Sequence, residues 1–145
     1  MERLAECGCG RLKVRVTGEP LDVMACHCDF CLKRTGSAYP VAAWFSKDQV
    51  LEVSGESTTY NGLEVDGVGP GGGDTIGISY HFCPTCGSTV YWTFDTLPDE
   101  LTEMMADVFV VAVGNFADPD FPPPVQHHFP ELRPRWLTPH RTGAP

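Results

Sequence analysis

Apolar and polar residues alternate in short runs along most of this chain, and glycine and proline residues separate the runs. An alternation with a period of two is typical of strands that bury one face of a sheet. Residues 108–114 are instead a continuous, largely β-branched apolar run, which predicts an inner strand that crosses the core. The other expected strands cover residues 11–16, 21–25, 41–46, 49–53, 57–60, 75–82 and 88–94. The pattern therefore predicts a mainly β protein.

Helical signals are sparse. Only residues 98–105 read as a helix, with Pro98 first and acidic residues in the opening turn. Residues 66–74 contain a run of glycines, and we expect a mobile loop there. No Lys-Ser or Lys-Thr follows these glycines, so they do not match a phosphate-binding loop. After Ala117 the chain is rich in proline and is expected to wrap the surface in an extended conformation.

The length and charge of the chain narrow its class. Its 145 residues predict one domain over residues 1–145, with a proline-rich surface tail from residue 118. The formal net charge is −9 and the basic residues form no stripe, which opposes a nucleic-acid partner. No run approaches the roughly 20 apolar residues of a membrane span, and no signal peptide is recognised. We expect a soluble cytoplasmic protein with reduced thiols; nothing indicates its oligomeric state.

All seven cysteines lie in short clusters. Because seven is an odd number, the cysteines cannot all pair as disulfides within one chain. They divide into four and three: four thiolates close a tetrahedral zinc site, whereas three leave one position open for water or a substrate. The clusters are Cys7-x-Cys9, Cys26-x-Cys28-x-x-Cys31 and Cys83-x-x-Cys86. This division predicts one structural and one reactive metal.

The first and last clusters together supply four thiolates. Two residues between Cys83 and Cys86 let the backbone turn around one ion, and the glycine that follows permits a tight turn. Cys7 and Cys9 form a shorter version, also flanked by glycine. A site that combines both pairs would fix the amino-terminal strand to the hairpin around Cys83.

The middle cluster packs Cys26, Cys28 and Cys31 into six residues, which favours one ion with an open fourth position. One alternative is a closed structural site completed by a distant histidine. The candidates for that ligand are His81, His127 and His128. His27 is expected to point away from the metal because it lies between two ligands, and Asp29 and Thr35 are candidates for proton transfer.

Other uses of the cysteines stay open at this level. Cys28 and Cys31 could join Cys83 and Cys86 in an ordinary zinc ribbon, which would leave the remaining three cysteines without partners. Iron–sulfur ligation is not excluded by spacing, although the familiar ferredoxin runs are absent. A purely redox role is disfavoured because the Cys-x-x-Cys pairs lack a βαβ context.

The cysteine motifs in this order resemble the glutathione-dependent formaldehyde-activating enzyme family, also described through centromere protein V. The resemblance is carried by residues 7–10, 26–37 and 82–87, and more loosely by residues 113–116 and 124–136. It implies a single zinc-binding domain of several coiled antiparallel sheets with little helix. It also implies two zinc ions per chain, the structural zinc on Cys7, Cys9, Cys83 and Cys86 and the catalytic zinc on Cys26, Cys28 and Cys31.

The family activity is reversible carbon–sulfur bond formation between glutathione and formaldehyde, which gives S-hydroxymethylglutathione. The resemblance thus implies a zinc-dependent carbon–sulfur lyase that acts on a small thiol adduct, with glutathione as the thiol. The charge of −9 does not favour a pocket for anionic glutathione, so the substrate stays open. A non-catalytic zinc module that binds a thiol metabolite or a protein is the alternative function, and a chromatin adaptor is opposed by the charge.

Overall fold

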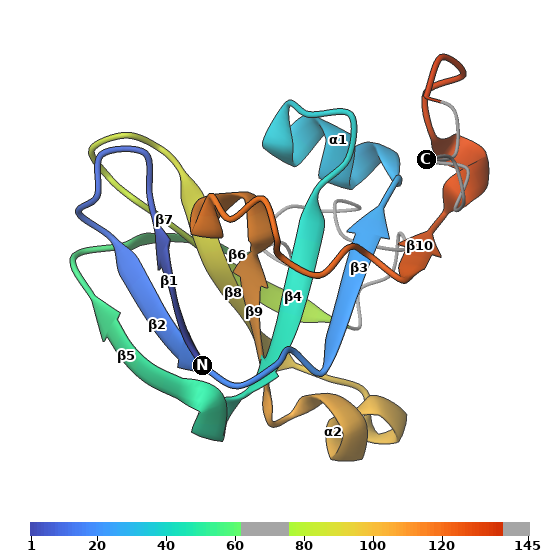
Figure 1. Ribbon diagram of the computed structural model, residues 1–145. Helices are drawn as coiled ribbons and strands as arrows, with labels where there is room; N and C mark the ends of the chain where they lie inside the picture. The colour runs from blue at the N-terminus through green and yellow to red at the C-terminus, as the bar shows by residue number, and fades with distance from the viewer. Residues whose placement is uncertain (62–75, 138–145) are drawn as a thin grey trace.

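The protein is described by a computed structural model over residues 1–61 and 76–137. Its strands form two sheets, which confirms the prediction of a mainly β fold (Figure 1). The loop expected at residues 66–74 and the first residue of the strand expected at 75–82 lie outside the described residues. Among the described residues, no helix is both long and apolar enough to cross a membrane.

The smaller sheet has three antiparallel strands, in the order β1 (Glu2–Glu6), β2 (Lys13–Thr17) and β5 (Val50–Ser54). The alternation in β2 buries Val14 and Val16 completely and leaves the residues between and around them nearer to solvent. Strand β1 was not expected from the sequence. Only one of its five residues, Ala5, is buried, and three of the others are charged. Its strand conformation therefore depends on backbone pairing with β2 along its whole length.

The larger sheet has seven strands, in the order β10-β3-β4-β9-β8-β7-β6. Its strands are β3 (Asp22–Cys26), β4 (Val41–Ser46), β6 (Thr58–Asn61), β7 (Gly77–Phe82), β8 (Thr89–Thr96), β9 (Val108–Ala112) and β10 (Gln126–His128). Neighbouring strands are antiparallel except β10, which pairs in parallel with β3. The proline-rich tail therefore returns to the sheet instead of only wrapping the surface (Figure 1).

The inner strands of the larger sheet are apolar on both faces. In β9, Val110 and Val111 are both fully buried and point to opposite faces, which confirms the expected inner strand. Val111 joins the core that contains Val14 and Val16 of the smaller sheet, together with Phe45 from β4. Val110 belongs to a second cluster on the other face. The chain leaves β9 at Ala112 and turns in the short helix η3 (Val113–Phe116).

The second face carries a row of large side chains across neighbouring strands. Trp44 is opposite Val110, Val110 is opposite Trp92, and Trp92 is opposite Tyr80. The Tyr80 and Trp92 ring centroids are 5.7 Å apart, a separation typical of paired aromatic rings. Because side chains of one strand alternate between faces, Cys26 shares this face with Met24 of β3. The aromatic row and Cys26 therefore lie on the same face of the larger sheet.

Two α-helices flank the sheets: α1 (Asp29–Thr35) above the ends of β3 and β4, and α2 (Asp99–Met105) at the opposite end (Figure 1). Helix α2 matches the helix expected at residues 98–105. The expectation that this was the only helix is wrong, because α1 occupies the segment interpreted as a metal loop. Two short 3₁₀ helices accompany η3 in the described residues: η1 (Lys47–Gln49), which leads into β5, and η4 (Pro130–Leu132) in the tail.

Candidate metal sites

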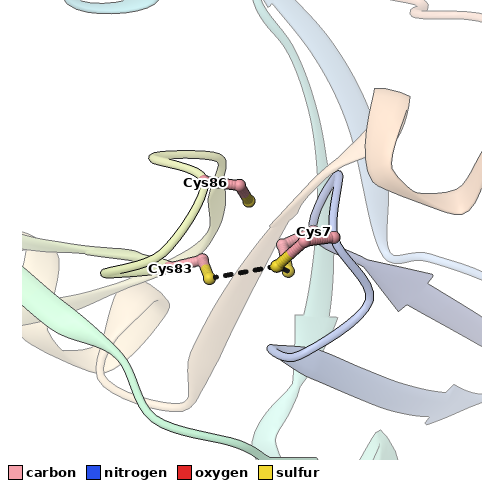
Figure 2. Close-up of side chains that lie close together, drawn as sticks. Cys7, Cys83 and Cys86 are labelled. Carbon is pink, nitrogen blue, oxygen red and sulfur yellow. Dashed lines mark hydrogen bonds between the residues drawn. The ribbon is translucent and has the colours of Figure 1, made fainter.

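Four cysteines from distant parts of the chain meet at one end of the smaller sheet. Figure 2 shows Cys7, from the loop after β1, facing Cys83 and Cys86 of the turn between β7 and β8. With Cys9, their sulfur atoms all lie within 4.8 Å of one another. Cys9 Sγ is 3.6 Å from Cys7 Sγ and 3.7 Å from Cys83 Sγ.

These separations fit a shared cation. A disulfide would place two sulfurs about 2.05 Å apart. Zinc–sulfur bonds of about 2.3 Å in a tetrahedron place the sulfurs roughly 3.8 Å apart. The observed distances of 3.6 and 3.7 Å match the tetrahedral arrangement. The four cysteines are thus spaced as ligands of one ion.

The local backbone explains how this arrangement forms. Gly10 and Gly87 follow the two cysteine pairs with φ of 73° and 76°, a conformation that strains residues with a Cβ. Each glycine N–H donates to a carbonyl three or four residues earlier, of Cys7 at 2.9 Å and of Cys83 at 2.8 Å. The Leu12 N–H also donates to Cys7 Sγ at 3.2 Å. Backbone donors therefore favour a thiolate at Cys7.

The middle cluster lies where β3 gives way to α1. Cys26 ends β3, Cys28 is the N-cap of α1 and Cys31 is the buried residue of that helix. Cys26 Sγ and Cys28 Sγ are 3.5 Å apart, and the three sulfurs lie within 4.8 Å of one another. The Cys31 N–H donates to Cys28 Sγ at 3.4 Å, so the sulfur occupies the position of an N-cap oxygen.

Helix signals around this cluster are present in the sequence. Asp29 lies in the first turn, Lys33 and Arg34 lie in the last turn, and Gly36 ends the helix with φ of 65°. The charges complement the helix dipole, and Gly36 donates its N–H to the Leu32 carbonyl at 2.8 Å. These terminal signals identify the helix that the loop interpretation missed.

The three thiols of this cluster differ in pKa, because ionisation of one disfavours ionisation of its neighbours. A hydrogen bond from Cys31 is the largest influence that lowers the pKa of Cys26, to about 5, and the nearby His128 adds to it. The same hydrogen bond, together with burial, raises the pKa of Cys31. Burial raises the pKa of Cys28. Three thiolates so close together repel one another, and a bound cation would offset that repulsion. The electrostatics of the cluster therefore fit a metal.

None of the three candidate histidines joins this cluster. His81 stacks on Tyr91 with ring centroids 4.2 Å apart and bonds to Ser57 at 3.2 Å, in another part of the sheet. His127 pairs with His27, 3.0 Å between ring nitrogens. Among residues 1–61 and 76–137, the metal-ligand group at this position contains only the three cysteines. His128 lies beside it, opposite Cys26 in the parallel register, without entering the group.

The other sequence candidates are also placed. His27 is 2% exposed, and its ring pairs with His127. The Asp29 carboxylate pairs with Lys33 at 2.9 Å on the exposed side of α1. The Thr35 hydroxyl donates to the Cys31 carbonyl at 2.7 Å, one helical turn back. Asp29 and Thr35 thus have structural partners.

The zinc-ribbon alternative is not supported by the cysteine positions. Cys28 and Cys31 lie apart from Cys83 and Cys86, so these four residues do not form one ligand group.

A cavity of about 210 Å³ opens beside Cys26 and Cys31. Its floor is the aromatic face of the larger sheet, and Arg34 and His128 contribute its basic groups. The described lining is Met24, Cys26, Cys31, Arg34, Pro40, Ala42, Trp44, Ile76, Ile78, Tyr80, Trp92, Phe94, Met105, His128 and Phe129. Arg34 was not among the sequence candidates. Its spacing of three residues from Cys31 would have placed both on one helix face, had the helix been recognised.

A second cavity, of about 650 Å³, lies beside the four-cysteine cluster. Its described lining includes Cys7, Ser88 and Asn115, and it shares Arg34 with the apolar cavity. The Ser88 hydroxyl lies 3.3 Å from Cys86 Sγ and lowers the pKa of Cys86 to about 5. This cavity is the more polar of the two, because hydroxyl, amide and backbone groups line it.

The family model for the glutathione-dependent formaldehyde-activating enzyme matches residues 2–131, which contain all seven cysteines. No curated protein matches the chain. The match covers both cysteine clusters, the aromatic sheet face and strand β10. On that coverage, this chain belongs to the glutathione-dependent formaldehyde-activating enzyme family.

Proposed function

We propose that this protein is a zinc-dependent carbon–sulfur lyase, working in either direction on a small thiol adduct. The observation that supports this proposal most directly is the three-cysteine cluster at the wall of a cavity. Three protein ligands and an open fourth position are typical of catalytic zinc, whereas four protein ligands are typical of structural zinc. Cys26 and Cys31 line the 210 Å³ cavity, so the open side of the cluster is accessible to a small molecule.

The proposal assigns one zinc to each cluster, two per chain. Cys7, Cys9, Cys83 and Cys86 would hold the structural zinc, which ties the loop after β1 to the turn after β7. Cys26, Cys28 and Cys31 would hold the catalytic zinc. Reduced cysteines in both clusters suit a cytoplasmic protein.

The reaction class follows from the family name and from the thiolate-rich site. The name of the family points to glutathione and formaldehyde as substrates. In the synthetic direction the thiol loses its proton, its sulfur bonds to the carbonyl carbon, and the carbonyl oxygen takes up one proton. The product is a hydroxymethyl thioether, and the reverse reaction breaks the same carbon–sulfur bond. Bound zinc favours the deprotonated form of a thiol and stabilises negative charge on oxygen.

Side chains of the cavity support this chemistry in two ways. The aromatic wall excludes water, and electrostatic interactions strengthen in such surroundings. Tyr80 lies on this wall and is 4% exposed. Burial raises the pKa of Tyr80, so its phenol stays protonated and neutral at physiological pH. The Tyr80 hydroxyl has no hydrogen-bond partner among the described residues and is available to donate to a substrate oxygen.

Exchange spectroscopy tests the proposal. Proton NMR of the zinc-loaded chain should show faster exchange between formaldehyde and its thiol adduct than in buffer, with at least one thiol of a set that includes glutathione and several smaller thiols. Cys28→Ser should abolish the acceleration and remove one zinc while the other stays bound. Lys33→Gln, on the exposed side of the same helix, is the matched control and should leave the rate unchanged.

The same experiment separates the enzyme from a binding module. Saturable binding of thiols without any acceleration would replace the lyase proposal with a non-catalytic zinc module. A full acceleration in Cys28→Ser would show that the reaction does not need the middle cluster. Either result would overturn the proposed function.

A further inference from the structure

The cavity beside Cys26 has walls that select for an apolar occupant. Trp44, Tyr80, Trp92 and Phe94 form its aromatic part, and Met24 and other aliphatic side chains complete it. No carboxylate is present among the described residues that line it. Burying a charged or polar group against such walls is unfavourable unless a partner is supplied. The walls therefore favour a hydrocarbon body over a peptide.

The cavity volume sets the size of that body. An apolar cavity of about 150 Å³ accommodates a benzene molecule. The present cavity, at about 210 Å³, has room for one ring or branched chain with a short substituent. Glutathione is larger and carries two carboxylates and one ammonium group, and the described walls do not pair that set of charges.

Arg34 provides one specific exception to this apolar character. Its guanidinium carbon lies 4.1 Å from the centroid of Tyr80 and 5.2 Å from that of Trp92, so the two rings hold the cation at the cavity wall. Its Nε is buried and has no hydrogen-bond partner among residues 1–61 and 76–137. No ion pair is formed by Arg34 within that part of the chain, whereas the adjacent Lys33 pairs with Asp29.

An unpaired guanidinium on an apolar wall is a binding group for an anion. Arginine donates two parallel hydrogen bonds to a carboxylate, and such charge-assisted bonds strengthen where water is excluded. Arg34 also lines the polar cavity, so an anionic group that reaches it is not confined among the rings. Tyr80 and Trp92 fix the guanidinium in place, which reduces the entropy lost on binding.

We propose that the cavity takes a thiol, or its carbonyl adduct, with a compact aromatic or branched apolar body and one anionic group that pairs with Arg34. This substrate class rests on the proposed function, and it replaces the tripeptide glutathione as the molecule that this chain binds in the cavity. The sulfur lies towards Cys26 and Cys31, the body lies on the aromatic wall, and the anion faces Arg34.

Binding of simple probes tests this substrate class without catalysis. Two of the cavity residues are tryptophans, Trp44 and Trp92, so their fluorescence reports occupancy. Phenylacetate should quench the zinc-loaded full chain saturably and bind about tenfold more tightly than phenylacetamide, which lacks the charge, or acetate, which lacks the ring. In Arg34→Gln the affinity for phenylacetate should fall to that for phenylacetamide, which itself should not change.

Lys33→Gln is the matched control, because it removes a neighbouring cation that faces solvent. It should leave the affinity for phenylacetate unchanged, and circular dichroism and zinc content should be the same in both variants. Equal affinities for phenylacetate and phenylacetamide would overturn the proposal. So would an unchanged affinity in Arg34→Gln, which would show that the carboxylate binds elsewhere, for example on the metal.

The outcome also separates this inference from the proposed function. If phenylacetate binds as expected and no thiol exchange is accelerated, the substrate class stands and the lyase proposal fails. If glutathione exchange is accelerated and phenylacetate does not bind, the lyase proposal stands and the inferred substrate class fails.

Discussion

His27 Nε2 and His127 Nδ1 are 3.0 Å apart, and their rings stack at an interplanar angle of 11°. This contact joins the loop that carries Cys26 and Cys28 to strand β10, 100 positions later in the chain. The His27 N–H also donates to the His128 carbonyl at 2.9 Å. The middle cysteine cluster is therefore held in place partly by the carboxyl-terminal tail.

This relationship predicts a distant effect on metal retention. His127→Ala leaves the ring of His27, which is 2% exposed, without its side-chain hydrogen bond. An unsatisfied buried polar group costs about 1–3 kcal/mol, which should appear as a lower free energy of unfolding. Chelator competition should release zinc from the middle cluster faster and leave the four-cysteine cluster unaffected. Val125→Ala, at a side chain 75% exposed on the same tail, is the control. Equal zinc release in both variants would contradict the positioning role.

The two cysteine clusters should respond differently to the loss of one ligand. Cys83 is 1% exposed and belongs to the main core. Cys83→Ser should therefore lose one zinc and should lower the free energy of unfolding strongly. Cys28→Ser should lose the other zinc and retain a cooperative unfolding transition. Zinc analysis combined with chemical denaturation of both variants measures this difference. Equal destabilisation by the two substitutions would contradict the division into structural and catalytic sites.

Much of the fold could be predicted from local patterns. The strand expected at residues 41–46 has those bounds in the structure, because its alternating apolar residues meet two cores. The spacing of the cysteines also indicated how they group. Strand β10 could not be predicted, because Gln126–His128 has no alternation and all its residues are exposed. Its conformation comes from backbone pairing with β3, which is remote in sequence.

Helix α1 and Arg34 were missed for a related reason. A helix of seven residues has too few turns to show a periodic apolar face, and its stability depends on tertiary contacts. Without the helix, the sequence gives no reason to place Arg34 on the same face as Cys31. The aromatic rings that contact Arg34, Tyr80 and Trp92, come from β7 and β8, which are remote from α1 in the sequence. Such an arrangement is visible only in three dimensions.

The core between the sheets should be the main source of stability. Phe45 is fully buried and packs against Phe116, with ring centroids 6.3 Å apart. Truncation of a buried phenylalanine to alanine costs about 3–5 kcal/mol, since it removes apolar contacts and leaves a cavity. Phe45→Ala should show this loss in urea denaturation. Leu51→Ala, at a side chain 48% exposed on β5, should change the free energy of unfolding by less than about 0.5 kcal/mol. Similar losses in both variants would contradict this location of the core.

Gly55 should tolerate no side chain, because two separate constraints act on it. Its φ is 94°, and a Cβ built there would lie 1.9 Å from the Arg11 carbonyl oxygen. An alanine in the left-handed conformation costs about 1–2 kcal/mol. The clash with the Arg11 backbone must also displace β5 from its neighbour, so Gly55→Ala should lower the free energy of unfolding by about 3 kcal/mol or more. Gly36 also has a positive φ, of 65°, but no atom lies within 4 Å of an added Cβ. Gly36→Ala should therefore be destabilised only by the left-handed strain. Thermal and chemical unfolding of the two variants compares the clash with the strain directly. A Gly55→Ala variant no less stable than Gly36→Ala would contradict the close approach of Gly55 to the Arg11 backbone.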